Sequence, residues 1–218
     1  NINAMGNYYH PKLIICDYLF IKTLPKRDFI SGMAEVIKSV LITDKNKTKF
    51  IKENSKKIMN CEKKTTIKMI IMIIKIKLGL VSQDEREKNI RMFLNYGHTV
   101  GQAIESSSNL KLEYYRHGEA VALGMLSVAY IAEKYFKISN LYQDHYEIFK
   151  RYNLPVKIER LSKSKKEILS IIFRNISKDK KKNYKGIRFV LLKGIGKPKI
   201  ISTLKSNLIK ESIYRLIR

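Results

Sequence analysis

Apolar residues recur along most of the chain at the three- and four-residue spacing of helices. Pro25 suits a first helical turn, so the pattern predicts a helix from there to about Val40, followed by a Lys-rich helical stretch to about Lys57. A long helix is expected from Thr65 to about Val81, apolar enough that most of its circumference should be buried. Further helices are expected over Thr99–Ser106, Gly118–Tyr135, Asn140–Tyr152, Lys165–Ile176 and from Thr203 onward.

Two short apolar runs have the character of strands. Lys12–Cys16 (KLIIC) indicates a buried strand that ends at Asp17, and Arg188–Leu192 (RFVLL) indicates a second strand. Strands and helices do not alternate as in a doubly wound sheet, and no GxGxxG motif follows a strand. The predicted fold class is therefore mainly α with one or two short strands, and no dinucleotide-binding fold is expected within these residues.

Composition is consistent with a globular domain. The chain has 218 residues, of which 44% are hydrophobic, enough to bury an apolar core. The most apolar run, Met69–Ile74, is far too short to span a membrane, so no membrane partner is expected. Cys16 and Cys61 have no metal-binding spacing and favour a reducing, cytoplasmic compartment. The sequence begins at Asn1 without a methionine, which suggests a fragment or a processed chain.

The formal net charge of +25 raises the question of nucleic-acid binding. A binding arm would concentrate its cations on one segment, with arginine well represented for bidentate contacts. Here lysine greatly outnumbers arginine, is spread along the whole chain, and accompanies an excess of isoleucine and asparagine. That joint enrichment is typical of an AT-rich coding bias, so nucleic acid is not the expected partner.

Three residues form a candidate metal-ligand set. His98 and His117 stand at glycine-marked helix starts, and Glu35 lies on an otherwise apolar helical face, where an unpaired carboxylate is costly to bury. Catalytic zinc sites commonly take three ligands from His, Glu and Asp and leave one position open. From spacing alone, histidines with satisfied hydrogen bonds in a protein core are the commoner case, so both readings stay open.

Three segments resemble the signature segments of 3-dehydroquinate synthases: Gly32–Lys38, Asn95–Thr99 and His117–Met125. They occur in the family's order and spacing, and the similarity extends from about Asn3 to Gly196. The resemblance implies the family's helical C-terminal domain, with its N-terminal α/β NAD-binding domain largely absent. Residues 1–24 would then be the end of the NAD-binding domain and a connecting segment, and residues 25–218 the helical metal- and substrate-binding domain.

In that family the metal ligands fall on Glu35, His98 and His117, which implies Zn²⁺ or Co²⁺ as cofactor beside NAD. The implied reaction converts a seven-carbon 2-keto-3-deoxy sugar-acid phosphate (DAHP) to 3-dehydroquinate and phosphate, in the shikimate pathway. An alcohol is oxidised by NAD, phosphate is eliminated, the ketone is reduced again and a carbocycle closes. The metal polarises first the hydroxyl and then the carbonyl.

The resemblance also assigns residues to substrate and cofactor. Lys38 would be catalytic, and the small anionic phosphate substrate would contact Asn3, Lys77, Arg91, Asn95, Lys180 and Lys181. The chemistry agrees, because Lys38 follows Glu35 by three residues on one helical face, and the Arg91 fork suits phosphate or carboxylate. The cofactor-contacting segment would be Phe20, Ile21, Lys22 and Thr23.

Gln102 departs from the family pattern. The family usually has a second histidine at this position, one helical turn after the first, where it contacts the phosphate region and takes part in proton transfer. Glutamine can donate a hydrogen bond but cannot exchange a proton near neutral pH. Phosphate elimination in the family is assisted by the substrate's own phosphate, so the change should slow the enzyme without abolishing activity.

The family implies a homo-oligomer, a dimer, for the complete protein, and an NAD-binding half supplied in cis or in trans. Without that half, the chain should bind metal but not turn over. Two alternatives remain at this stage: a related cyclase that makes inosose or valiolone rings, or a non-catalytic basic helical domain that has lost enzyme function. A metal-dependent polyol dehydrogenase fits less well, because the cations that would bind phosphate are present.

Overall fold

A computed structural model describes residues 9, 11–87, 89–108, 115–159, 163–182 and 187–218. Its helices are α1 Phe20–Thr23, α2 Lys26–Leu41, α3 Lys45–Glu53, α4 Ser55–Met59, α5 Lys63–Gln83, α6 His98–Ser108, α7 His117–Phe136, α8 Leu141–Arg151, α9 Lys165–Lys182 and α10 Ser206–Leu216. A 3₁₀ helix, η1, covers Ile90–Asn95. The strands β1 (Phe189–Leu192) and β2 (Pro198–Ile201) pair antiparallel, with Val190 opposite Ile200. The predicted class, mainly α with short strands, is confirmed.

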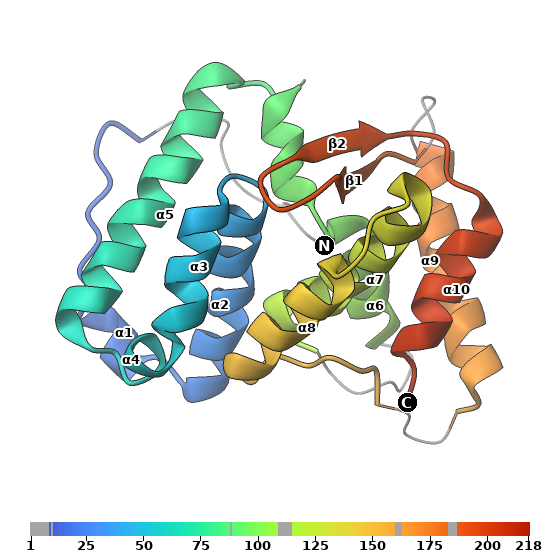
Figure 1. Ribbon diagram of the computed structural model, residues 1–218, viewed down its shortest axis with the longest axis horizontal. Helices are drawn as coiled ribbons and strands as arrows, with labels where there is room; N and C mark the ends of the chain where they lie inside the picture. The colour runs from blue at the N-terminus through green and yellow to red at the C-terminus, as the bar shows by residue number, and fades with distance from the viewer. Residues whose placement is uncertain (1–8, 10, 88, 109–114, 160–162, 183–186) are drawn as a thin grey trace.

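Helix α7 is the centre of the molecule. Every residue from Gly118 to Ala132 is buried, so this helix has no solvent-facing stripe. Helices α2, α6, α8 and α10 and strand β1 surround it (Figure 1). The starts of α6 and α7 and the middle of α2 thereby meet on one side of the core. Within the described part of the chain, no helix is both long and apolar enough to cross a membrane.

Glycines allow α7 to approach its neighbours closely. A Cβ atom at Gly118 would lie 1.9 Å from the carbonyl oxygen of Ser31 in α2, and one at Gly124 would lie 2.0 Å from the carbonyl oxygen of Gly97, just before α6. Gly97 itself has a φ of +78° and faces the backbone of Met125. Any side chain at Gly118 or Gly124 would push α7 away from α2 or α6, and with it the residues at the helix starts.

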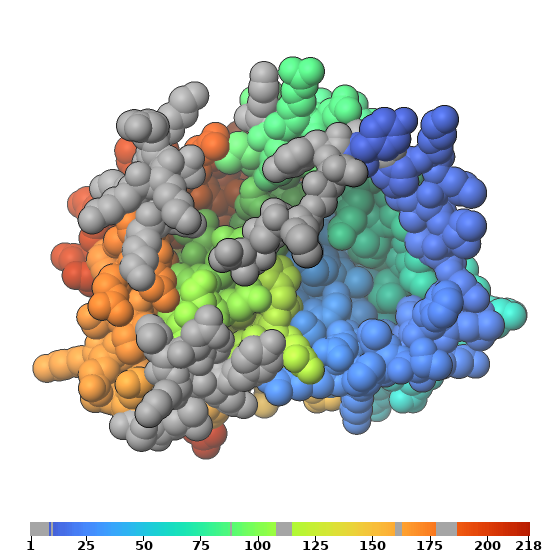
Figure 2. Space-filling model, turned by 180° about the vertical axis from the view of Figure 1, so that it is seen from behind, coloured from blue at the N-terminus to red at the C-terminus, as the bar shows by residue number. Residues whose placement is uncertain are grey.

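Two expectations about apolar segments are wrong. Residues 12–16 form no strand, and Leu13, Ile14 and Ile15 are 74%, 64% and 83% exposed. A strand needs a partner for its backbone groups, and the described sheet contains only β1 and β2. In the view from behind, the segment that follows residue 10 stands along one edge of the molecule rather than inside it (Figure 2).

Helix α5 was expected to bury most of its circumference, but only Thr66, Met69 and Ile76 are buried. Ile71 and Leu78 are 48% and 54% exposed. The cause is its position: α5 packs on α2, α4 and η1 at the outer side of the bundle (Figure 1), and this packing leaves Ile71 and Leu78 about half exposed. Helix α5 therefore has apolar residues on the face that packs against the bundle and also on its exposed side.

Replacing Gly124 by alanine tests the close approach of α6 and α7. The added Cβ would meet backbone atoms that cannot rotate away, so Gly124→Ala should lower the free energy of unfolding by ~1–3 kcal/mol. The matched control is Gly32→Ala in α2, where a Cβ meets nothing within 4 Å and alanine should raise helix stability by up to about 1 kcal/mol. Urea unfolding of both variants provides the measurement. A stabilised Gly124→Ala would contradict the packing described here.

Candidate metal centre

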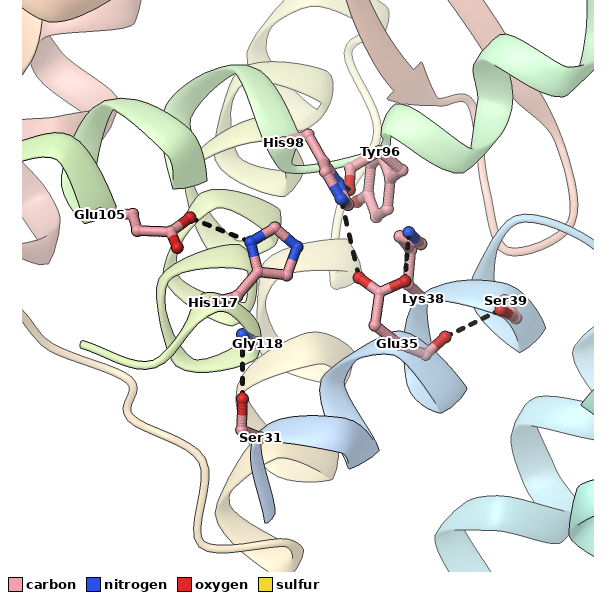
Figure 3. A network of polar contacts seen from close by, with 9 residues as sticks. All are labelled: Ser31, Glu35, Lys38, Ser39, Tyr96, His98, Glu105, His117 and Gly118. Atoms are coloured by element: carbon pink, nitrogen blue, oxygen red, sulfur yellow. Dashed lines mark hydrogen bonds and ion pairs between the residues drawn. The ribbon is translucent and has the colours of Figure 1, made fainter. Parts of the chain in front are cut away.

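Three elements bring the predicted ligands together. Glu35 projects from α2, His98 opens α6 and His117 opens α7. One ligand atom of each residue lies within 4.8 Å of those of the other two. His98 Nε2 is 3.7 Å from Glu35 Oε1, and the two imidazole rings are 5.3 Å apart between centroids (Figure 3). The ligand set predicted from the sequence is therefore one cluster in space.

Hydrogen bonds orient both imidazoles toward the cluster. His98 Nδ1 lies 3.3 Å from the carbonyl oxygen of Tyr96, and His117 Nδ1 lies 2.9 Å from Oε2 of Glu105. A carbonyl oxygen can only accept, so His98 carries its proton on Nδ1 and its Nε2 lone pair faces Glu35. In Figure 3 the second ring nitrogen of His117 also faces the cluster. Metal-bound histidines usually donate their other N–H to a carbonyl or carboxylate, as both do here.

The two carboxylate oxygens of Glu35 have different surroundings. Its Oε2 accepts a 2.7 Å hydrogen bond from Nζ of Lys38, which is only 3% exposed. Its Oε1 is buried and accepts no hydrogen bond from any residue that the structure describes. A buried, unsatisfied carboxylate oxygen beside two imidazole nitrogens is costly by itself and suits a bound cation. The donor set, two imidazoles and one carboxylate, is one that zinc commonly takes.

Burial and charge fix the protonation states. Burial acts to raise the pKa of Glu35, but the charge and hydrogen bond of Lys38, followed by the charges of His98 and Lys77, outweigh it and leave the pKa lowered. Burial, together with the charge of Lys38, lowers the pKa of His98 to about 4. Burial also lowers the pKa of Lys38, with Glu35 opposing the shift. At neutral pH, Glu35 is therefore ionised and His98 is neutral, the states that metal ligation requires.

A cleft of about 210 Å³ adjoins the cluster. Its lining consists of Glu35, Lys38, Lys77, Glu87, Arg91, Leu94, Asn95 and His98. The lining thus includes Lys38, Lys77, Arg91 and Asn95, residues that the family resemblance assigns to catalysis and substrate, together with the ligands Glu35 and His98. Three cations against two carboxylates, Glu35 and Glu87, leave the lining with a net positive charge, which favours an anionic occupant.

The carboxylate of Asp84 positions Arg91, which is part of the cleft lining. It accepts hydrogen bonds from the backbone N–H groups of Asn89 (2.7 Å) and Arg91 (3.0 Å) and so fixes the entry into η1. The guanidinium of Arg91 donates to the carbonyl oxygen of Glu85 at 2.5 Å. These contacts hold Arg91 at the cleft, although its helix is only a short 3₁₀ turn.

Two functional candidates were missed from the sequence. Glu87 lines the cleft and accepts a 2.8 Å hydrogen bond from Asn95, but the charged loop that contains it has no periodicity that would single it out. Glu105 follows His98 by seven residues, two turns of α6, which places it on the same helical face and could have indicated its contact with His117.

Other predicted residues are not part of this cleft lining or lie outside the described residues. Gln102 is half-buried on α6 and is not part of the cleft lining. Phe20, Ile21, Lys22 and Thr23 form the single turn α1, in which no residue is buried. Asn3 lies outside the described residues. Lys180 and Lys181 belong to the last turn of α9, and their side chains lie outside the described part of the chain.

Solved structures share this architecture. A 2-deoxy-scyllo-inosose synthase complexed with carbaglucose-6-phosphate, NAD⁺ and Co²⁺ matches 99% of this chain and 59% of its own, with a TM-score of 0.77 and 26% identity. A 2-epi-5-epi-valiolone synthase from Streptomyces hygroscopicus, with NAD⁺ and Zn²⁺ bound, matches 98% of this chain and 58% of its own, with a TM-score of 0.84. At 18% identity, the second match supports the shared fold alone. The fold and the ligand cluster thus define a domain of the sugar-phosphate cyclase class.

The family model described as 3-dehydroquinate synthase C-terminal matches residues 32–182, more than half of the chain, and the chain belongs to this family. The 3-dehydroquinate synthase of Thermoanaerobacter pseudethanolicus is 35% identical over 215 residues, covering 95% of this chain and 56% of that protein. The 3-dehydroquinate synthase of Campylobacter fetus is 36% identical over 218 residues, covering 99% of this chain and 58% of that protein. The chain therefore spans a little over half the length of these relatives.

The fully buried His145 makes stability depend on pH. Burial lowers its pKa to about 4, below the ordinary value of 6.5, so the unfolded chain binds more protons between these values. The stabilisation is complete above 6.5 and is lost as the pH falls toward 4. In metal-free protein, this residue should account for a loss of about 2 kcal/mol between about pH 7 and pH 5. Denaturant unfolding of the natural chain and His145→Gln should show it as a difference in slope with pH, and parallel curves would contradict it.

Proposed function

We propose that this chain is the metal- and substrate-binding half of a 3-dehydroquinate synthase. Zn²⁺ or Co²⁺ would be held by Glu35, His98 and His117, and the activity would convert DAHP to 3-dehydroquinate and phosphate with NAD. The single observation that carries the proposal is the convergence of these three ligand atoms within 4.8 Å beside a cleft with three cations. The curated relatives named 3-dehydroquinate synthase, at 35–36% identity, support this substrate over other cyclised products.

The residues of the cleft have separable roles in the proposed reaction. When bound, the metal would polarise the substrate hydroxyl and then the carbonyl, which eases loss of the neighbouring proton. Arg91 and Lys77 would hold the phosphate and carboxylate groups, the first through its planar fork and the second as a point charge. Lys38 remains tied to Glu35 and would add its charge at the reacting end of the cleft. Glu87 adds a carboxylate to the lining that could accept a proton from the substrate.

The activity would also require an NAD-binding half. Support comes from the uncovered apolar side chains of Leu13, Ile15 and Phe20 in the first segment and of Ile71 and Leu78 in α5. Exposed apolar groups of this kind usually mark a surface that another domain or chain covers. We therefore propose that residues 1–24 connect to an NAD-binding domain, with Phe20–Thr23 at the cofactor, and that the complete enzyme is a homodimer. The part of the relatives' length that this chain does not span leaves room for such a domain.

A related cyclase is the second candidate, favoured by the likeness to the 2-deoxy-scyllo-inosose synthase structure, which holds a sugar-phosphate analogue. The two candidates differ in substrate. After this chain is joined to an NAD-binding half, phosphate release should be measured with DAHP and with glucose 6-phosphate in parallel. We expect release from DAHP. Release from glucose 6-phosphate alone would replace the first candidate by the second.

Metal content tests the ligand assignment. The purified chain should contain one zinc or cobalt per molecule after metal loading and dialysis, measured by elemental analysis. His117→Ala should weaken binding more than the roughly 10–100-fold that loss of a hydrogen-bond partner of a ligand costs. Because the His117 side chain is 43% exposed, this truncation should leave the fold intact. Glu105→Ala, which removes only the hydrogen-bond partner, should fall within that range.

Cys16→Ser is the matched control for adventitious metal, since Cys16 is an exposed thiol outside the cluster. Metal content that survives His117→Ala and disappears in Cys16→Ser would contradict the assignment.

Gln102→His tests the departure from the family pattern. In the enzyme joined to its NAD-binding half, this substitution should raise the turnover number more than it changes the Michaelis constant. Gln102 does not line the described cleft, but it follows His98 by one turn of α6, and the prediction requires this side chain to reach the substrate once the NAD-binding half is joined. There histidine could exchange a proton, where glutamine only donates a hydrogen bond. General acid–base assistance is worth about 10²–10⁴-fold, and substrate-assisted elimination should keep the gain near the lower end. Steady-state kinetics decide, and an equal or lower turnover would show that the site functions with glutamine.

A further inference from the structure

His145 is a buried histidine with no part in the site described so far. It lies on α8 with an exposed fraction of 0% and neither belongs to the ligand cluster nor lines the cleft. Its Nδ1 lies 2.7 Å from the carbonyl oxygen of Leu141, which can only accept, so Nδ1 carries the proton. Its Nε2 is therefore an acceptor, and it lies 2.9 Å from the hydroxyl of Tyr96. The Tyr96 hydroxyl must donate to His145.

Tyr96 connects this buried pair to the metal cluster. It is fully buried in the turn between η1 and α6, and its backbone N–H donates to the carbonyl oxygen of Phe93 at 3.0 Å. Its own carbonyl oxygen accepts the 3.3 Å hydrogen bond from Nδ1 of His98. Gly97, the next residue, has a φ of +78°, so the chain turns sharply between this carbonyl and His98. Two hydrogen bonds thus join Leu141 to His145 and His145 to the Tyr96 hydroxyl, and a third joins the Tyr96 carbonyl to His98, with the covalent frame of Tyr96 between them.

We propose that His145 is a positioning residue for His98, acting through the hydroxyl and the backbone carbonyl of Tyr96. The inference rests on the proposed metal site and deepens it. The hydrogen bond from Tyr96 to His145 holds the turn between η1 and α6 against α8. The position of this turn sets the direction of the Tyr96 carbonyl, and that carbonyl orients the imidazole of His98. Outer hydrogen-bond partners of a metal ligand fix its tautomer and ring orientation, and such partners contribute measurably to metal affinity.

A purely structural pair would behave differently. A buried hydrogen bond contributes only about 1 kcal/mol to stability, and replacing both partners by apolar groups of similar shape can be nearly neutral. If the pair only fills the core, an apolar replacement that folds well should bind metal normally. If it positions His98, metal affinity should stay low even when stability is restored. Stability and metal affinity are thus the two quantities to separate.

Cobalt titration of the metal-free chain makes this separation, because the visible d–d absorption of Co²⁺ reports both affinity and coordination geometry. Tyr96→Phe and His145→Leu should each weaken Co²⁺ binding about tenfold, the lower end for a ligand's outer partners, and should change the spectrum. His145→Gln should recover much of the affinity, since its amide oxygen can accept from the Tyr96 hydroxyl. The double variant Tyr96→Phe/His145→Leu should regain stability without regaining affinity.

Tyr152→Phe is the matched control. Tyr152 is equally buried and donates a 2.8 Å hydrogen bond to the carbonyl oxygen of Ile51, far in sequence from any ligand. This variant should lose a similar amount of stability and keep both the Co²⁺ affinity and the spectrum of the natural chain.

The outcomes separate the two proposals. If the natural chain binds Co²⁺ and the Tyr96 and His145 variants match Tyr152→Phe in affinity and spectrum, the positioning role is overturned and the metal site stands. If the natural chain gives no cobalt spectrum that depends on His98, both the metal site and the role of His145 are overturned.

Discussion

The candidate site depends on how closely the buried helix α7 approaches α2 and α6. Backbone touches backbone at Gly118 and Gly124, where an added Cβ would lie about 2 Å from a carbonyl oxygen of the neighbouring element. The amide of Gly118 also donates to the Ser31 hydroxyl at 3.0 Å. Because His117 precedes Gly118 and His98 follows Gly97, the same contacts that close the core also set the separation of the ligands. Ligand geometry is here a consequence of helix packing rather than of a loop.

The ligand cluster and the adjoining cleft differ in charge. One oxygen of Glu35 is neutralised by Lys38, while the other is left buried and unsatisfied toward the two histidines. Burial, followed by the nearby charge of Lys38, lowers the pKa of His98, so the unprotonated imidazole presents a lone pair. On the other side, Lys77 and Arg91 extend the positive field along the cleft. In the proposed function, a divalent metal would therefore lie beside the negative Glu35 and an anionic substrate beside the positive Lys77 and Arg91.

Much of this could be predicted from the sequence. Helices such as Lys26–Leu41 and His117–Phe136 follow from local periodicity, and the ligand set followed from residue types and from the family resemblance. The sequence did not predict which apolar segments would be covered by other parts of the chain. Lys12–Cys16 has the composition of a buried strand and α5 that of a buried helix, but burial depends on what packs against them, which local composition does not record. Glu87 and Glu105 were missed, as were the roles proposed for Tyr96 and His145, because they come from contacts between segments that are separate in the sequence.

X-ray absorption spectroscopy of the zinc-loaded chain tests the central claim most directly, because it reports the ligand atoms themselves. The account predicts a first shell of nitrogen and oxygen only, at about 2.0–2.2 Å, with the multiple-scattering pattern of two imidazoles. Substitution of His98 by alanine should remove one imidazole contribution. A sulfur shell at about 2.3 Å, or a zinc spectrum without imidazole scattering, would contradict the assignment of Glu35, His98 and His117 as the metal centre.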